Sequence, residues 1–141
     1  MKLLYYTSKD CLSKEDLTNT QIFSMLNKQI KIVPQITIDE TCPIYLIVMM
    51  DNFVPNLTNP EFKDCSISFS ILCHPDNWNL GDFELRPYKI IGEIDSLLNK
   101  QKLNGIGTLE FSSATNLVLN ESLMGLTISY SAIHGVDDMI P

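Results

Sequence analysis

Residues 64–73 constrain the fold more than any other segment, because their apolar and polar side chains alternate. One side carries Cys65, Ile67, Phe69, Ile71 and Cys73, and the other carries Ser66, Ser68 and Ser70, with Leu72 breaking the polar side. Successive side chains of a strand point to opposite faces, so a period of two is typical of a strand. The segment therefore predicts a half-buried strand.

Further strands are expected on both sides of this segment. Residues 44–51 form a continuous apolar run, which is typical of a strand buried on both faces. Residues 123–134 alternate again. Shorter strands are expected at 35–39, 106–111 and 116–120, the last two joined by a turn around 112–115.

Two segments have helical spacing. Residues 13–30 place Ser13 as a cap before apolar residues at roughly helical intervals. Residues 86–100 carry Pro87 in the first turn and an apolar stripe. Asn104-Gly105 is expected to form the turn by which the chain leaves this helix. Residues 52–63 and 74–81 are predicted to be loops.

The element order indicates one α+β domain over residues 1–141. We expect an antiparallel or mixed sheet of about five strands, with two helices packed on one face. A chain of 141 residues is long enough to bury a core without disulfides or metals. No repeat or linker divides the sequence.

Composition limits the partners and the compartment. The net charge of −7 is of the wrong sign for tight binding to nucleic-acid phosphates. The longest apolar run, 44–50, is far shorter than the ~20 residues of a membrane-spanning helix. Residues 1–6 do not resemble a secretory signal. The four cysteines have no C-x-x-C spacing, so we expect reduced thiols in a cytosolic protein.

Catalytic chemistry has little support in the sequence. His74 and His134 have no second ligand at zinc-site spacing, so neither a metal nor a cofactor is expected. Cys73 should lie on the apolar face of its strand, where a thiol behaves as a small hydrophobe. Gly105 and Gly107 follow a helix rather than open one, so they indicate a helix cap and a turn instead of a phosphate site.

Large apolar residues in the two predicted loops are the candidate interaction site. They are Phe53, Val54, Phe62, Trp78, Leu80 and Phe83. Such residues either fold under the loop as a satellite core or contact another subunit. The sequence does not decide between a satellite core and a subunit contact, and only the subunit contact would give these residues a function in binding.

The second half of the chain resembles the tail-terminator and head–tail joining proteins of tailed bacteriophages. The resemblance rests on three segments. They are Arg86-Pro87-Tyr88-Lys89-Ile90-Ile91-Gly92-Glu93-Ile94-Asp95, Leu103-Asn104-Gly105-Ile106-Gly107 with Leu109-Glu110-Phe111, and Gly125-Leu126-Thr127-Ile128-Ser129-Tyr130-Ser131-Ala132-Ile133-His134-Gly135.

The resemblance implies a structural subunit without catalytic residues. Such subunits form a ring, commonly hexameric, that terminates the tail tube or joins it to the head connector of the virion, after synthesis in the host bacterial cytoplasm. DNA would pass the acidic ring without specific binding. The alternative is a small cytosolic enzyme or small-molecule binding domain that uses Cys73 with His74 or His134.

Overall fold

The computed structural model describes residues 1–32 and 42–134, without the side chains of residues 52 and 134. The expected strand at 35–39 lies outside the described residues. The helices are α1 (Lys2–Tyr5), α2 (Asn19–Met25) and α3 (Arg86–Leu98), with 3-10 turns at Cys11–Ser13 and Pro75–Asn77. The strands are β1 (Ile30–Lys31), β2 (Ile44–Pro55), β3 (Lys63–Cys73), β4 (Lys102–Leu103), β5 (Gly107–Thr108), β6 (Glu110–Val118) and β7 (Met124–His134).

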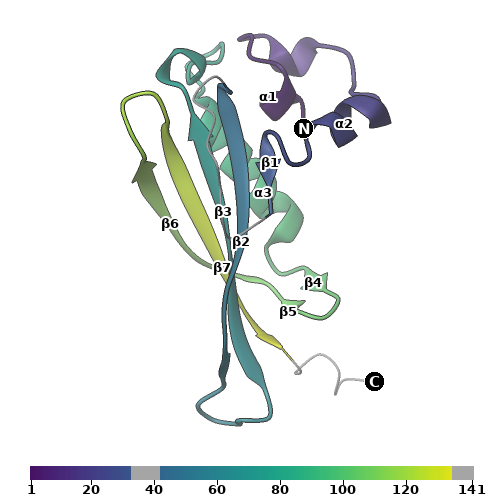
Figure 1. Cartoon of the computed structure of the whole chain (residues 1–141), viewed down its shortest axis with the longest axis vertical. Coiled ribbons are helices and arrows are strands. Elements are labelled where there is room, and N and C mark those ends of the chain that lie inside the picture. The colour runs from purple at the N-terminus through teal and green to yellow at the C-terminus, as the bar shows by residue number, and fades with distance from the viewer. Residues whose placement is uncertain (33–41, 135–141) are drawn as a thin grey trace.

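Five strands form one mixed sheet in the order β1-β2-β3-β7-β6. β1 runs parallel to β2, and the other neighbours are antiparallel. β4 and β5 form a separate small hairpin. The α+β class and the mixed sheet of about five strands are confirmed, and Figure 1 shows α3 along the sheet.

The helices pack on one face of the sheet. Met25 of α2 and Ile90 of α3 belong to the same core cluster as Ile71 of β3. A second cluster on this face joins Phe69 and Tyr130 to the apolar side of α3. The hydroxyl of Tyr130 donates a hydrogen bond of 2.9 Å to Asp95 Oδ1, which fixes α3 across β7.

The serine side of β3 is also largely buried, although the alternation predicted a half-buried strand. Ser68 and Ser70 are only 7% and 4% exposed. Their hydroxyls bond Ser129 at 3.0 Å and Thr127 at 2.8 Å, and Ser68 also donates to Asp51 at 3.1 Å. Each buried hydroxyl therefore has a partner on a neighbouring strand, as burial of polar groups requires.

Three of the predicted element boundaries are wrong. The helix expected at 13–30 is only α2, which begins after a capping box of Thr18 and Gln21 and ends before Asn27, whose φ of 64° is left-handed. The loop expected at 52–63 is shorter, because β2 and β3 stay paired through a bulge to Pro55 and Lys63. The hairpin expected around 112–115 is absent from this described segment, because β6 pairs with β7 along its length through one bulge.

The role expected for Gly105 is also wrong. The cap of α3 is Asn99, and Lys100 takes the left-handed backbone with φ 61°. Gly105, with φ 76°, instead turns the hairpin between β4 and β5. The physical reason is that the helix and its apolar stripe both end at Leu98, so Gly105 falls in the turn of the next element.

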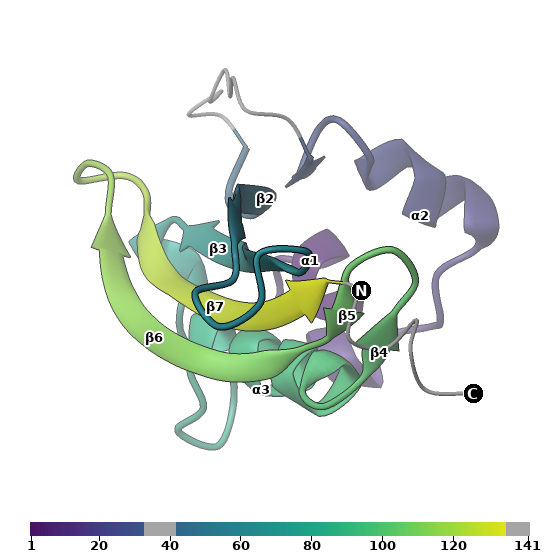
Figure 2. The ribbon, with the colours of Figure 1, turned by 90° about the horizontal axis from the view of Figure 1, so that it is seen from below.

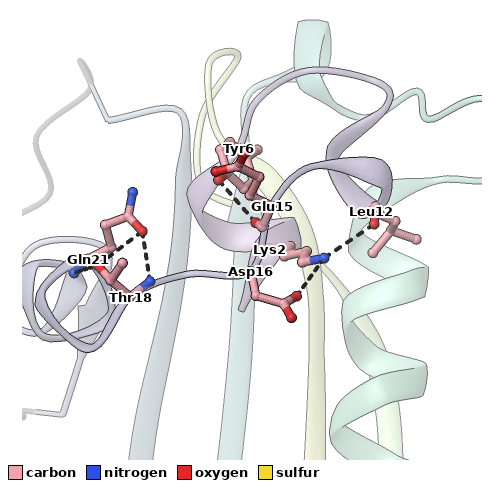
Figure 3. A network of polar contacts seen from close by, with 7 residues as sticks. All are labelled: Lys2, Tyr6, Leu12, Glu15, Asp16, Thr18 and Gln21. Atoms are coloured by element: carbon pink, nitrogen blue, oxygen red, sulfur yellow. Dashed lines mark hydrogen bonds and ion pairs between the residues drawn. The ribbon is translucent and has the colours of Figure 1, made fainter.

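The N-terminal segment is held together by short polar contacts, which Figure 3 shows. Lys2 Nζ lies 2.8 Å from Asp16 Oδ1 and donates to the carbonyl of Leu12. The ion pair and hydrogen bond with Lys2 lower the pKa of Asp16. The hydroxyl of Tyr6 donates to the carbonyl of Glu15 at 3.2 Å. These contacts fold residues 1–16 into a compact unit.

A buried arginine joins this N-terminal unit to α3. Arg86, the first residue of α3, has no exposed surface. Its guanidinium donates to the backbone carbonyls of Leu3, Tyr6, Thr7, Ser8 and Asn77, at 2.7–3.0 Å. The planar fork of arginine suits such a set of fixed acceptors better than the point charge of lysine does.

Replacing Arg86 by Met should destabilise the whole chain. The variant leaves buried carbonyls without donors, at a cost of about 1–3 kcal/mol each, so we expect a loss of at least about 3 kcal/mol in the free energy of unfolding. Urea unfolding followed by circular dichroism measures it. The control is Lys89→Met on the exposed side of α3, which should change stability by less than about 0.5 kcal/mol. Equal stability of Arg86→Met and wild type would contradict the role of this clamp.

Candidate functional site

The β2–β3 hairpin carries apolar side chains at its free end. Figure 1 shows the turn of this hairpin as the lowest point of the molecule. Phe53 and Val54 are about half exposed, at 50% and 48%, and Leu57 is fully exposed. We call these three residues the hairpin tip. Phe62, predicted as a fourth contact residue, is half-buried beside it.

The turn that presents the hairpin tip is held by Asn56. Its amide Nδ2 donates to Asp64 Oδ1 at 2.8 Å, and its Oδ1 accepts from the backbone N–H groups of Thr58 and Asn59. The Asn56 N–H also bonds the carbonyl of Phe62 at 2.9 Å. The tip is therefore an ordered apolar projection, which reduces the entropy lost when it binds a partner.

The second predicted loop divides into core and surface. Leu80 is 7% exposed and belongs to the core cluster of Ile71 and Ile90. Trp78 packs against the same cluster, and its Nε1 donates to the carbonyl of Cys73 at 3.1 Å. The structure thus places Trp78 and Leu80 under the loop, while Phe83 lies outside it.

Phe83 occupies an unusual turn. Asp82 and Phe83 both have left-handed φ values, 59° and 62°, and the N–H of Glu84 bonds the carbonyl of Gly81 at 3.3 Å. This is a type I′ turn, whose second central position favours glycine. A left-handed residue with a side chain costs about 1–2 kcal/mol. Phe83 nevertheless has its side chain fully in solvent, with a relative exposure of 106%.

A cavity lined by two lysines, which the sequence did not predict, lies on another side of the molecule. It has a volume of about 560 Å³ and lies between the α2–β1 turn and the start of β2. We call it the basic pocket, lined among others by Lys28, Gln29, Lys31, Cys42 and Tyr45. Lys31 Nζ lies 5.8 Å from the centre of the Tyr45 ring. The close spacing of the two lysines was the only signal in the sequence.

Of the residues proposed for an enzyme, His134 lies at the opposite end of β3 from the neighbours Cys73 and His74. Cys73 is fully buried, and burial raises its pKa to about 12. His74 Nδ1 accepts from the N–H of Asp76 at 3.2 Å and so caps the turn at 75–77. His134 pairs with Lys63 at one end of β3, whereas Cys73 pairs with Met124 at the other.

The described parts of the chain also show no cluster for a metal ion. Within residues 1–32 and 42–134, no three His, Cys, Asp or Glu side chains gather as ligands. No helix in these ranges has the length and apolar character needed to span a bilayer.

Comparison with known proteins adds a family to this description. The fold defines a small α+β protein with one main mixed sheet. The chain belongs to the YomW family, whose model matches residues 1–132. The family name is associated with bacteriophages, so the chain is a phage-related protein, in agreement with the phage origin that the sequence resemblance implied. No curated protein matches the chain.

The position of Cys73 predicts slow alkylation. A thiol with a pKa near 12 has only about one molecule in 10⁵ ionised at pH 7, and the thiolate is the nucleophile. In native protein treated with iodoacetamide, we expect the half-buried Cys42 to be labelled first and Cys73 to react only after denaturation. Peptide mass spectrometry measures both sites. Rapid labelling of native Cys73 would instead favour the enzyme alternative.

Trp78→Ala should destabilise the folded chain itself. Removing a large, partly buried ring that also bonds Cys73 should cost about 2–3 kcal/mol. Thermal unfolding by circular dichroism at low protein concentration measures it, and Leu57→Ala at the hairpin tip serves as a control with a change below about 0.5 kcal/mol. If Trp78→Ala left the melting temperature unchanged but weakened self-association, Trp78 would be a subunit-contact residue and not a core residue.

Proposed function

We propose that this phage-related chain is a structural subunit of the virion neck or tail. Copies of it form a ring, commonly hexameric in the class it resembles, that terminates the tail tube or joins it to the head connector. The resemblance over residues 86–135 and the YomW family support a phage role. The observation that carries the structural role is the apolar hairpin tip.

The hairpin tip is suited to bind protein. Covering a large apolar side chain contributes about 1.5–3 kcal/mol, and half of that remains available for Phe53 and Val54. Leu57, fully exposed, adds its whole side chain. Because the tip lies at the end of a two-stranded projection, it can reach a neighbouring subunit without disturbing the core beneath α3.

The charge of the chain fits a ring through which DNA passes. With a net charge of −7, the protein repels phosphates more than it attracts them. Contacts to DNA would then be weak, and the tail-tube protein and connector would be the partners that bind. The enzyme alternative has less support, because Cys73 is buried and lies far along the sheet from His134.

Polar substitution of the hairpin tip tests this function. The variant Phe53→Ser/Val54→Ser/Leu57→Ser should keep the far-ultraviolet spectrum of wild type but lose its rings, because the exposed apolar area is removed. Sedimentation velocity and negative-stain electron microscopy measure the assembly. The matched control is Leu97→Ser, at an apolar residue of α3 that is 71% exposed, and it should assemble normally.

Two outcomes would count against the proposal in different ways. Rings in the triple variant would remove the hairpin tip from the interface but leave the structural role intact. A wild-type chain that stays monomeric alone and on isolated tail tubes would overturn the ring itself.

A further inference from the structure

The turn at Phe83 has a backbone cost that the Phe83 side chain does not repay by packing. Its Asp-Phe pair occupies the two left-handed positions where Asp-Gly is a preferred pair. The ring of Phe83 is fully exposed, so it gains no packing in the monomer. Residues held in such conformations gather at functional sites, where the strain serves binding or catalysis. An aromatic side chain displayed in this way is suited to anchor a protein contact.

The chemistry around Phe83 describes the surface that would receive it. Asp82 and Glu84 flank the ring, and both are exposed. Glu84 is paired with Lys89 at 3.1 Å, whereas Asp82 forms no ion pair within residues 1–32 and 42–134. The receiving surface should therefore combine room for an aromatic ring with positive charge at its rim.

The basic pocket has both properties. Its volume of about 560 Å³ is within the range of pockets that hold small ligands. Lys28 is exposed at its rim, and Lys31 already lies against an aromatic face, that of Tyr45. A lysine is attracted to the negative face of an aromatic ring. Lys28 and Lys31 can therefore contact both the Phe83 ring and the Asp82 carboxylate.

The two surfaces lie on different sides of one molecule. In Figure 2, α3, into which the Phe83 loop leads, lies in the lower half of the view, and α2 lies at the upper right. Insertion of Phe83 into the pocket of another copy can join two copies across a two-fold axis, where each copy contributes both surfaces, or join successive copies head to tail. A head-to-tail contact closes into a ring when the rotation permits, which is the arrangement that the proposed function needs.

We infer that Phe83 inserts into the basic pocket of a second copy of this chain, so that successive copies join head to tail. The inference rests on the ring of the proposed function and adds a defined contact to it. Asp82 of one copy then lies near Lys28 of the next, and this pair sets the register of the two subunits.

Phe83→Gly separates this inference from an ordinary role in folding. The variant creates the Asp-Gly pair, so its melting temperature should rise while its association weakens at least about tenfold. The matched control is Lys100→Gly, which relieves the same left-handed backbone at a second exposed site with φ 61°. That control should also melt higher, but it should associate like wild type. Differential scanning calorimetry and sedimentation velocity give the two readouts.

A charge exchange tests the identity of the pocket. Lys28→Glu and Asp82→Lys should each weaken association, because each places like charges at the contact. The double variant, Asp82→Lys with Lys28→Glu, should recover association to within a few-fold of wild type. Its salt dependence should resemble that of wild type.

The outcomes distinguish the two proposals. If wild type forms rings and Phe83→Gly forms them equally well, the Phe83 contact is wrong and the structural function stands. If Phe83→Gly fails to assemble but the charge exchange does not restore association, Phe83 binds elsewhere and the assignment of the basic pocket is wrong. If wild type itself never assembles, the ring fails and this contact fails with it.

Discussion

The buried guanidinium of Arg86 is the interaction on which the arrangement of the chain depends. It stands at the first position of α3 and bonds carbonyls of Leu3 and of residues 6–8 in the N-terminal unit, and that of Asn77 in the loop before the helix. A buried charge is tolerated only when its donors are satisfied, so these segments must fold together. The clamp places α1 and α3 over the same face of the sheet and holds the Phe83 loop beside the start of α3.

The sheet shows how one domain can have two buried faces and still present apolar residues. The helices cover one face, where the clusters around Ile71 and Tyr130 lie. On the other face, Tyr45, Ile47 and Leu72 pack together, and serine hydroxyls bond across strands. Phe53, Val54, Leu57 and Phe83, which are exposed outside both layers, lie at the ends of projections. Those projections are the surfaces through which we propose that copies and other virion proteins bind.

The candidate interface illustrates why residue type alone did not locate the site. Trp78 and Phe83 are aromatic residues of the same loop, and the sequence gives no reason to separate them. The structure does, because Trp78 can reach the carbonyl of Cys73 while the turn directs Phe83 outward. The basic pocket was missed for a related reason: its lysines follow α2, whereas Tyr45 and Cys42 come from the beginning of β2.

Local sequence determined the alternating strand at β3, the helix that begins at Arg86, and the α+β class, because periodicity reports which side of an element meets the core. It also placed Cys73 on an apolar face. Tertiary structure decided the continuous β6, because β6 pairs with β7 along its length, and the length of the β2–β3 hairpin, because its strands stay paired through a bulge. Only the folded chain could show that Arg86 is buried, since its acceptors on residues 3–8 lie about eighty residues away.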